Sequence, residues 1–493
     1  MNWRIKSLDD SLALAEKRGL HRTLGGFQLM MLGVGAVIGT GIFVLTAEAA
    51  QKAGPGMMLS FVIAGFVCAV TALCYAELSS MVPVSGSAYT YSYSVLGEVV
   101  AWVVGWALIL EYAVAASAVS VGWSNYFIPL VERSFDVDIP VFLSRGYYSG
   151  GPGGLINLPA VCIALLVTWL LLIGTRESAR VNAVLVSIKI IALTIFIVLS
   201  VPVMQMDNFE PFAPLGFGGI SAAAASIFFA YVGFDAVSTA AEETKNPQRN
   251  LPIGLIGSLV ICTIFYLLVA AGAIGSIGAQ PVLDAAGAGL APGSREMGEV
   301  CAQAVNSGAL ACSDEPLAHV LRQLGWERVS RLIGLAAFLA LPSVILMMLF
   351  GQTRIFFAMS RDRLLPDVLS DIHPKYKTPH VVTLITGTFV TAAAAFFPVG
   401  KLADISNSGT LFAFFTVALG VMALRKSDPD RTRHFRTPFV GVVGPLALLG
   451  CAYLFVSLSL YTRLLFVGWT VFGLIIYRFY GYRRSPYASV REQ

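Results

Sequence analysis

The sequence predicts an all-α integral membrane protein of about twelve transmembrane helices, built as two inverted repeats of five helices with broken helices one and six. Three observations support this fold. Hydrophobic residues make up 56% of the chain and charged residues only 13%, whereas soluble domains carry about 25% charged residues. Apolar windows of transmembrane length recur along the chain. Glycine interrupts two of these windows, at corresponding places in the two repeats.

The apolar windows follow one another with short polar connections between most of them. Each transmembrane helix needs about 20 apolar residues. The predicted spans are 26–50, 57–81, 98–126, 157–176, 181–204, 219–241, 252–276, 331–358, 380–397, 402–424, 438–459 and 463–481. Because their number is even, both ends of the chain are expected on the same side of the membrane.

These spans divide the chain into segments with different expected roles. An N-terminal segment with an interfacial helix comes first, two repeats of five spans follow, and two further spans precede a tail. The segments are 1–25 for the N-terminal part, 26–204 for the first repeat, 219–424 for the second repeat, 277–330 for a long external loop within it, 438–481 for the last two spans and 482–493 for the tail. An odd number of spans in each repeat gives the repeats opposite orientations.

Basic residues are distributed unequally between the two sets of loops. Of the 33 lysines and arginines, 23 fall in the set that includes both termini, 9 fall in the opposite set, and Lys189 lies within a span. Cytoplasmic loops are the ones enriched in lysine and arginine, so both termini are predicted in the cytoplasm of a multi-pass plasma-membrane protein. The formal net charge of +4 is small and gives no reason to expect a nucleic-acid partner.

The first span contains a glycine-rich stretch that should interrupt its helix. Gly33, Gly35, Gly39 and Gly41 lie close together there, and glycine costs about 1 kcal/mol relative to alanine inside a helix. Broken backbone at bilayer depth persists where it lines a cavity, because its N–H and C=O groups need partners. Close helix packing through Gly35 and Gly39 is the alternative explanation. The glycines cover more than one helix face, which favours a binding site.

The sixth span is interrupted at 229–235, where a glycine and an acid follow an apolar helix. A half-helix N-terminus presents N–H groups and a positive dipole end, which suit a carboxylate. In the first break, the amides of Thr40, Gly41 and Ile42 are expected at such a half-helix N-terminus. Unwound carbonyls suit an ammonium group. The candidates are the Val37 carbonyl and the carbonyls of the second break. Together the breaks predict a zwitterionic α-amino acid as the ligand.

Three ionisable residues lie within spans, where each one is a functional hypothesis. Lys189 in the fifth span has three interpretations: a structural partner of Glu111 or Asp235, a proton carrier because burial disfavours its charged form, or an anion ligand. Glu111 in the third span is a pairing or gating residue, or a proton acceptor. Asp235 either binds the N–H groups of its own break or attracts a cationic group of the ligand.

Cysteines and histidines show no spacing typical of a metal site. Five of the 7 cysteines lie in apolar spans, whereas Cys301 and Cys312 share the long polar loop. The sequence leaves two alternatives for this pair, a disulfide or two free thiols. The 5 histidines lie in loops or at span ends, which argues against an intramembrane enzyme. The sequence therefore predicts no cofactor and no metal.

Six short motifs follow one another along most of the chain. They are 35–43 (GAVIGTGIF), 75–78 (YAEL), 83–89 (PVSGSAY), 228–235 (FFAYVGFD), 242–252 (EETKNPQRNLP) and 354–362 (RIFFAMSRD). In sequence and order they resemble the amino acid–polyamine–organocation superfamily, most closely its cationic amino acid transporter branch. The chain lacks the two additional spans of mammalian members, and its loop 277–330 is longer than expected for a bacterial member.

The resemblance implies a LeuT-like transporter of twelve spans that works by alternating access. It implies that amides of the first break take the substrate carboxylate and that carbonyls of both breaks take its ammonium group. Lys189 matches a lysine that occupies the place of a sodium ion in proton-coupled bacterial members, and Glu111 and Asp235 match the acids of the branch in spans three and six. The expected substrate-binding residues are Val37, Gly39, Thr40, Gly41, Ile42, Glu111, Phe229, Ala230, Val232 and Asp235.

These features favour a proton-coupled symporter of cationic or small neutral L-amino acids, surrounded by membrane lipids. An amino acid exchanger is the alternative within transport. A non-transporting amino acid sensor or an intramembrane enzyme would belong to a different class of protein. The sequence leaves open whether a small membrane protein binds to it.

Overall fold

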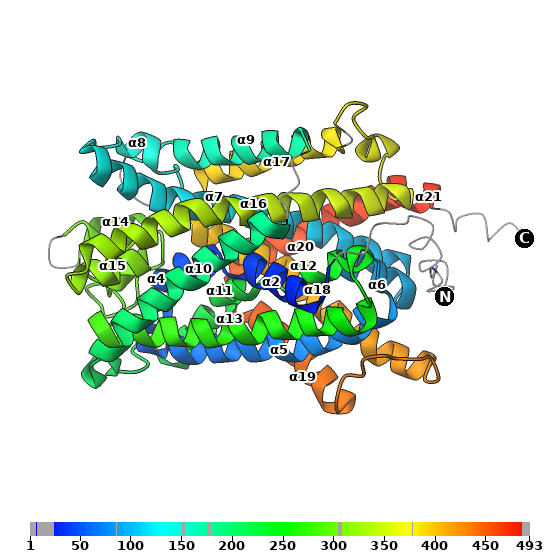
Figure 1. Cartoon of the computed structure of the whole chain (residues 1–493), viewed down its shortest axis with the longest axis horizontal. Helices are drawn as coiled ribbons and strands as arrows, with labels where there is room; N and C mark the ends of the chain where they lie inside the picture. The colour runs from blue at the N-terminus through cyan, green and yellow to red at the C-terminus, as the bar shows by residue number, and fades with distance from the viewer. Residues whose placement is uncertain are drawn as a thin grey trace, which may run out of the picture.

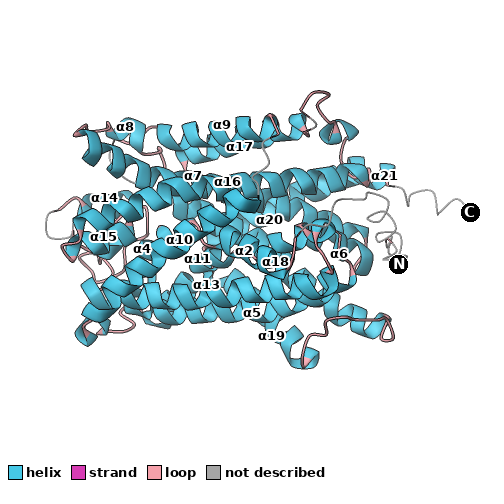
Figure 2. Cartoon of the chain, viewed as in Figure 1, coloured by secondary structure: helices cyan, strands magenta, loops and turns pink. Residues whose placement is uncertain are grey.

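The computed structural model describes residues 6, 24–84, 86–149, 153–174, 179–303, 308–376 and 378–485, apart from the side chains of residues 179, 180 and 242. The predicted interfacial helix within 1–25 and most of the tail 482–493 lie outside this part of the chain. Within it the protein is helical, and the β contacts are isolated bridges (Figure 2).

The first predicted repeat contains five spans, of which the first is broken. Its helices are α2 (Gly26–Val37), α3 (Thr40–Phe43) and α4 (Leu45–Ala53) in the first span, then α5 (Met57–Met81), α7 (Glu98–Phe135), α9 (Leu158–Leu172) and α10 (Ala179–Ser200). The connecting helices are α6 (Ser87–Val95) and α8 (Val141–Ser144).

The second predicted repeat is also broken in its first span, and two more spans follow it. Its helices are α11 (Gly216–Ile227), the 3-10 turn Phe228–Tyr231 and α12 (Ala236–Thr239) in the sixth span, then α13 (Pro247–Ile277), α16 (Glu327–Arg361), α17 (His380–Phe396) and α18 (Val399–Ser427). The helices after it are α19 (Val440–Ser457), α20 (Leu460–Ile476) and α21 (Tyr482–Arg484), and the long loop holds α14 (Arg295–Cys301) and α15 (Pro316–Gln323).

The described helices confirm the predicted all-α membrane fold. Nine of them are long and apolar enough to cross a membrane, and the shorter apolar helices Gly26–Val37, Leu158–Leu172 and His380–Phe396 supply the other spans. The largest boundary error concerns α7, which was expected to end at 126 and continues to Phe135. Its last turns carry Glu132 and Arg133, because a helix can continue past the apolar layer where its charged side chains reach water.

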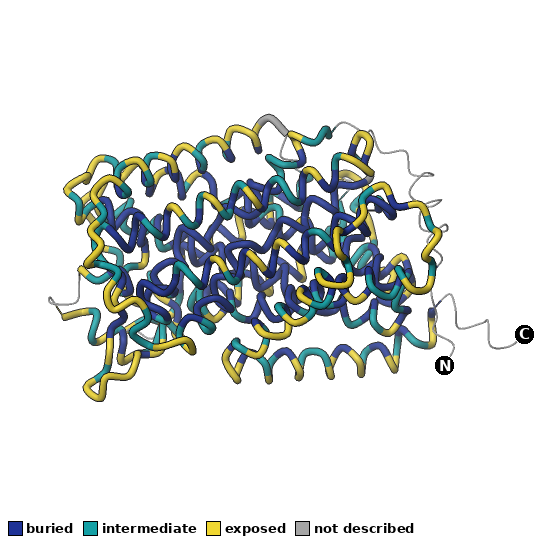
Figure 3. The backbone as a smooth tube through the Cα atoms, turned by 90° about the horizontal axis from the view of Figure 1, so that it is seen from below, coloured by how far each residue is buried: buried dark blue, intermediate teal, exposed yellow. Residues whose placement is uncertain are grey.

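The broken sixth span lies at the centre of the bundle and the last two spans at its edge. In the most apolar stretch of the sixth span, 89% of the residues are buried. In the corresponding stretch of α19, 22% are buried. α7 packs against both α16 and α18, and α13 packs against α2 and α5. α9 and α17 lie together along one flank (Figure 1). Figure 3 shows buried backbone through the middle of the bundle and exposed backbone around it.

The bundle has two different ends. α14 and α15 lie at one of them, which we call the loop end (Figure 1). At the other, the terminal end, Lys6 donates its N–H to the Tyr93 carbonyl of α6 at 3.3 Å. Ser485 donates there to Glu98, the first residue of α7. The described residues nearest to the two termini therefore lie at the same end of the bundle.

Candidate functional site

The first break separates α2 from α3 at Ile38 and Gly39. The backbone of Gly39 is extended, with φ −149° and ψ −148°, and a new helical turn begins at Thr40. The N–H groups of Thr40, Gly41 and Ile42 belong to this first turn, where a helix has no acceptor of its own. The three amides that the sequence predicts as carboxylate ligands therefore lie together at one buried helix start.

The two breaks touch each other directly. A Cβ atom at Gly41 would lie 2.2 Å from Cα of Ala230, so no larger residue fits there. In the second break Gly233 has φ +114°, which favours glycine, and a Cβ atom there would lie 3.1 Å from the carbonyl carbon of Ala36 in α2. Both glycines thus allow the broken segments of spans one and six to approach backbone to backbone.

Tyr266 of α13 links the two breaks through its hydroxyl group. The hydroxyl oxygen lies 2.8 Å from the Val37 carbonyl oxygen and 2.8 Å from the Ala230 carbonyl oxygen. The hydroxyl donates one hydrogen, and each carbonyl has two acceptor sites, so both carbonyls keep capacity for an ammonium donor. Tyr266 was not predicted from the sequence, although a hydroxyl in the middle of the apolar window 252–276 was a signal for it.

Asp235 follows the second break and is 1% exposed. Its Oδ1 accepts the Gly233 N–H at 3.3 Å, and its Oδ2 accepts the Tyr112 hydroxyl of α7 at 3.3 Å. The first contact is the one expected if Asp235 binds the N–H groups of its own break. Both bonds are long for a carboxylate, which leaves Asp235 with acceptor capacity toward a cationic group.

Glu111 precedes Tyr112 in α7 and is also 1% exposed. Neither of its carboxyl oxygens has a hydrogen-bond partner among the described residues. The same is true of the Tyr75 hydroxyl of α5 and of Oε1 of Gln352 in α16, whose amide nitrogen donates to the Ile109 carbonyl. Buried polar atoms are normally paired, so this part of α7 has unused capacity to bind a polar ligand.

Lys189 of α10 is fully buried, and its Nζ donates to the carbonyl oxygen of Gly35 at 2.8 Å. Gly35 lies in α2, two residues before Val37, so the lysine contacts the half-helix that carries a predicted ammonium ligand. This hydrogen bond to a backbone carbonyl is a contact that none of the three interpretations of Lys189 had included.

The other predicted contact residues are buried around the breaks. Phe229 is 6% exposed, Val232 4% and Ile42 0%. The Phe229 carbonyl accepts the Val232 N–H at 3.2 Å, so this carbonyl is engaged within its own turn. The Tyr231 hydroxyl donates to the Phe61 carbonyl of α5 at 3.0 Å. This contact holds Tyr231 against the second span.

A charged cluster closes the site toward the loop end. Nζ of Lys52 in α4 lies 2.7 Å from the Glu48 carboxylate and 3.5 Å from that of Asp404 in α18. The Ser226 hydroxyl of α11 contacts Lys52 and both carboxylates. The cluster joins the first, sixth and tenth spans, and it holds one cation against two anions.

A second set of contacts closes the site toward the terminal end. Nζ of Lys6 pairs with Asp362 at the end of α16 at 2.8 Å, and the Tyr89 hydroxyl of α6 donates to the same carboxylate at 2.9 Å. Arg354 of α16 pairs with Glu243 after α12 at 3.1 Å. The predicted substrate-binding residues are all buried, so the site is closed toward both ends.

The long loop is attached to the first span at the loop end. The Gln51 amide nitrogen of α4 donates to the carbonyls of Val282 and Leu290 at 2.8 and 2.9 Å. Cys301 and Cys312 are joined by a disulfide with their Cα atoms 5.5 Å apart. The loop therefore rests on the half-helix that follows the first break, and any movement of α4 must move the loop or break these bonds.

Broken helices that meet within a bundle of membrane spans are typical of membrane transporters. The chain belongs to the amino acid permease family, whose profile matches residues 24–479. It is 44% identical over 485 residues to the branched-chain amino acid permease BcaP of Bacillus subtilis (strain 168), with 98% of each chain covered. It is 41% identical over 484 residues to the methylthioribose transporter of the same strain, again with 98% of each chain covered.

A plant protein is similar over most of the chain as well. The cationic amino acid transporter 9, chloroplastic, of Arabidopsis thaliana is 36% identical over 439 residues, which cover 88% of this chain and 72% of the relative. These findings confirm the resemblance to the amino acid–polyamine–organocation superfamily. The chain is a multi-pass membrane protein of amino acid transport and not an enzyme.

Proposed function

We propose that the protein is a secondary active symporter that couples the uptake of L-amino acids to protons by alternating access. The observation that carries this proposal is the hydrogen bond from Lys189 to the Gly35 carbonyl. It connects a titratable group in the fifth span to the half-helix that ends at the predicted binding site. We place the protein in the plasma membrane with the terminal end in the cytoplasm, because the basic residues concentrate in the loops of that end.

The backbone of the two breaks binds the α-amino and α-carboxyl groups of the substrate. The amides of Thr40, Gly41 and Ile42 take the carboxylate, at the positive end of a helical turn. The carbonyls of Val37 and Ala230 take the ammonium group, and the Tyr266 hydroxyl holds these two oxygens near each other. Backbone groups bind every α-amino acid alike, so selectivity among amino acids comes from side chains.

Glu111 and Asp235 select a cationic substrate side chain. An ionised carboxylate that is buried without a partner costs several kcal/mol, and a guanidinium or ammonium group of arginine or lysine removes this cost. The name of the plant relative agrees with such a substrate. The name of BcaP favours a branched-chain substrate instead, and a protonated Glu111 would accept a small neutral side chain.

Proton coupling works through the Lys189 contact. The ammonium form of Lys189 donates to Gly35 and holds α2 against α10. When the lysine loses its proton to the cytoplasm, the charge-assisted bond is lost. α2 is then able to move, and the site opens toward the terminal end. Substrate release and proton release are thereby linked.

Uptake by proteoliposomes tests this mechanism. We expect an inward proton gradient to drive arginine accumulation by the wild type, and Lys189→Ala to abolish the gradient dependence while leaving arginine binding measurable. Gradient-driven accumulation by Lys189→Ala at the wild-type rate would contradict the mechanism. Empty liposomes distinguish a symporter from an exchanger. A symporter accumulates substrate in liposomes without internal amino acid, whereas an exchanger is nearly inactive in them.

A further inference from the structure

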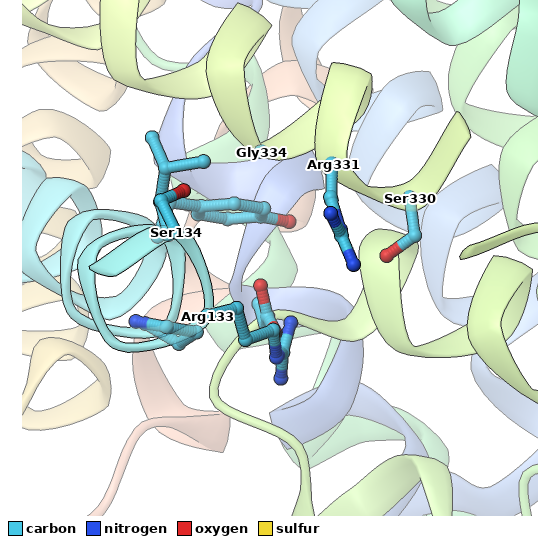
Figure 4. A pocket seen from close by; sticks show the side chains of 9 residues that line it. Arg133, Ser134, Ser330, Arg331 and Gly334 are labelled. Atoms are coloured by element: carbon cyan, nitrogen blue, oxygen red, sulfur yellow. Dashed lines mark ion pairs between the residues drawn. The ribbon is translucent and has the colours of Figure 1, made fainter. Parts of the chain in front are cut away.

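A pocket at the loop end is lined by arginines from two helices. It lies between the last turns of α7 and the first turns of α16, with Glu315 at its side and Tyr126 at its floor. The side chains of Arg133 from α7 and Arg331 from α16 extend into the same space (Figure 4). The pocket shares no lining residue with the two breaks or with the Lys52 and Lys6 clusters that close the substrate site.

Positive charge exceeds negative charge at this pocket. The Glu315 side chain is 7% exposed, and its Oε1 lies 2.8 Å from Arg133 and 2.6 Å from Arg322. One carboxylate therefore pairs with two guanidinium groups. Among the described residues no carboxylate pairs with Arg331, and this includes Glu327, which lies one turn before it on α16. Among the residues that line the pocket, two arginines against one glutamate leave an excess of one positive charge.

Such a pocket attracts an anion that accepts several hydrogen bonds. Guanidinium groups bind phosphate through paired N–H donors and hold their charge at every physiological pH. Arg133 is already paired with Glu315, whereas Arg331 is exposed beside it in the same lining. A phosphate group that bridges Arg133 and Arg331 gives the donors of Arg331 a charged acceptor.

The surface beside the pocket is apolar and exposed. Arg331, Leu335 and Leu339 follow one another at four-residue spacing and share one face of α16. Leu335 is 41% and Leu339 45% exposed, and Phe135 at the end of α7 is 73% exposed. Exposed apolar side chains on a membrane-spanning helix contact acyl chains, so Arg331 lies where such a stripe reaches the headgroup level.

We propose that the pocket between α7 and α16 binds the headgroup phosphate of an anionic phospholipid. Arg133 and Arg331 hold the phosphate, and the acyl chains follow the Leu335 and Leu339 face of α16. The bound lipid is linked to the first broken helix through Tyr126, a lining residue whose hydroxyl donates to the Phe43 carbonyl in α3 at 2.6 Å. Phospholipid composition therefore acts on the half-helix that starts at Thr40.

Lipid retention by the full-length purified protein tests the proposal. Phosphatidylglycerol and phosphatidylcholine with the same acyl chains are offered in micelles, and the lipid bound to the protein is measured by native mass spectrometry. We expect preferential binding of phosphatidylglycerol to the wild type. In the double variant Arg133→Gln/Arg331→Gln this binding should weaken roughly thirtyfold, since each basic residue near an anionic lipid contributes about fivefold.

Control variants separate this site from general surface charge. Arg328→Gln removes an exposed arginine one turn before Arg331 that does not line the pocket, and it should retain the wild-type preference. If the double variant does not fold, Arg331→Gln alone carries the test, because it breaks no described ion pair. Equal phosphatidylglycerol binding by wild type and Arg331→Gln, or equal losses in Arg331→Gln and Arg328→Gln, would overturn the proposal.

A soluble probe distinguishes the source of the phosphate. Glycerol phosphate at millimolar concentration should displace little phosphatidylglycerol, because it lacks the acyl chains that contact α16. Complete displacement by glycerol phosphate would overturn the lipid assignment. Transport supplies an independent measure: phosphatidylglycerol should change the arginine uptake rate of the wild type and leave that of the double variant unchanged.

Discussion

The Tyr266 hydroxyl lies 2.8 Å from a carbonyl oxygen in each of the two broken helices, that of Val37 in the first span and that of Ala230 in the sixth. These are two of the oxygens that should bind the substrate ammonium group. One side chain of α13 therefore joins a carbonyl of each break across the proposed binding site. It is not itself part of either break.

Replacement of Tyr266 by phenylalanine should weaken substrate binding. The variant removes the one hydroxyl hydrogen that lies between two buried carbonyls and hardly changes the size of the side chain. A hydrogen bond of this kind contributes about 0.5–1.5 kcal/mol. We expect arginine affinity in a radioligand binding assay to fall roughly threefold to tenfold. Tyr231→Phe is the matched control, because its hydroxyl bonds to Phe61 in α5. Equal effects of the two variants would show that Tyr266 acts only through packing.

Neutralisation of Glu111 should change substrate selectivity more than overall binding. Glu111→Gln replaces the buried carboxyl by a neutral amide, which offers no charge to a substrate guanidinium. A hydrogen bond to a charged group contributes about 1.5–3 kcal/mol. Competition assays should show arginine affinity falling roughly tenfold or more, while alanine and leucine change little. Glu132→Gln, near the loop end of the same helix, should affect none of them. Equal losses for arginine and alanine would exclude contact between Glu111 and the substrate side chain.

Much of the fold was predictable because it depends on local sequence properties. Apolar windows determine the spans, and glycine runs locate the breaks, as the close approach of Gly41 to Ala230 illustrates. The end of α7 was misplaced because hydropathy measures the apolar layer and not the length of the helix. The position of the unpaired N–H groups at Thr40 was predictable for the same local reason: the N–H groups at a helix start have no acceptor in their own helix.

Contacts between distant spans could not be predicted. The pairs Lys52 with Asp404 and Lys6 with Asp362 join residues that are 352 and 356 positions apart. Their formation depends on how each helix is rotated about its axis, which a single sequence does not report. The carbonyl that Lys189 contacts was hidden for the same reason, although the buried lysine itself was evident.

Removal of the Lys6 charge should favour opening at the terminal end. The Lys6–Asp362 pair is largely buried, with side-chain exposures of 9% and 11%, and loss of one partner from a buried pair costs about 3–5 kcal/mol. In Lys6→Ala we expect cysteine probes placed near α6 to be labelled faster than in the wild type. Lys375→Ala removes an exposed lysine at the same end and should not change labelling. Lys6→Asp combined with Asp362→Lys should restore slow labelling, and failure to do so would mean that the charge pair does not keep this end closed.

Acid should destabilise the loop end through His319 of α15. Burial lowers the pKa of His319 below its ordinary value of 6.5, with a smaller lowering by Arg322, while its contact with the Gly308 carbonyl at 3.1 Å acts in the opposite direction. The unfolded loop binds a proton more readily than the folded one, so folded-state stability falls as the pH drops below about 6.5. We expect the melting temperature of the wild type to fall more between pH 7.5 and pH 5 than that of His319→Gln. This difference in melting temperature should be the same with the disulfide of Cys301 and Cys312 intact and with it reduced. Identical pH profiles for wild type and variant would exclude His319 as the cause.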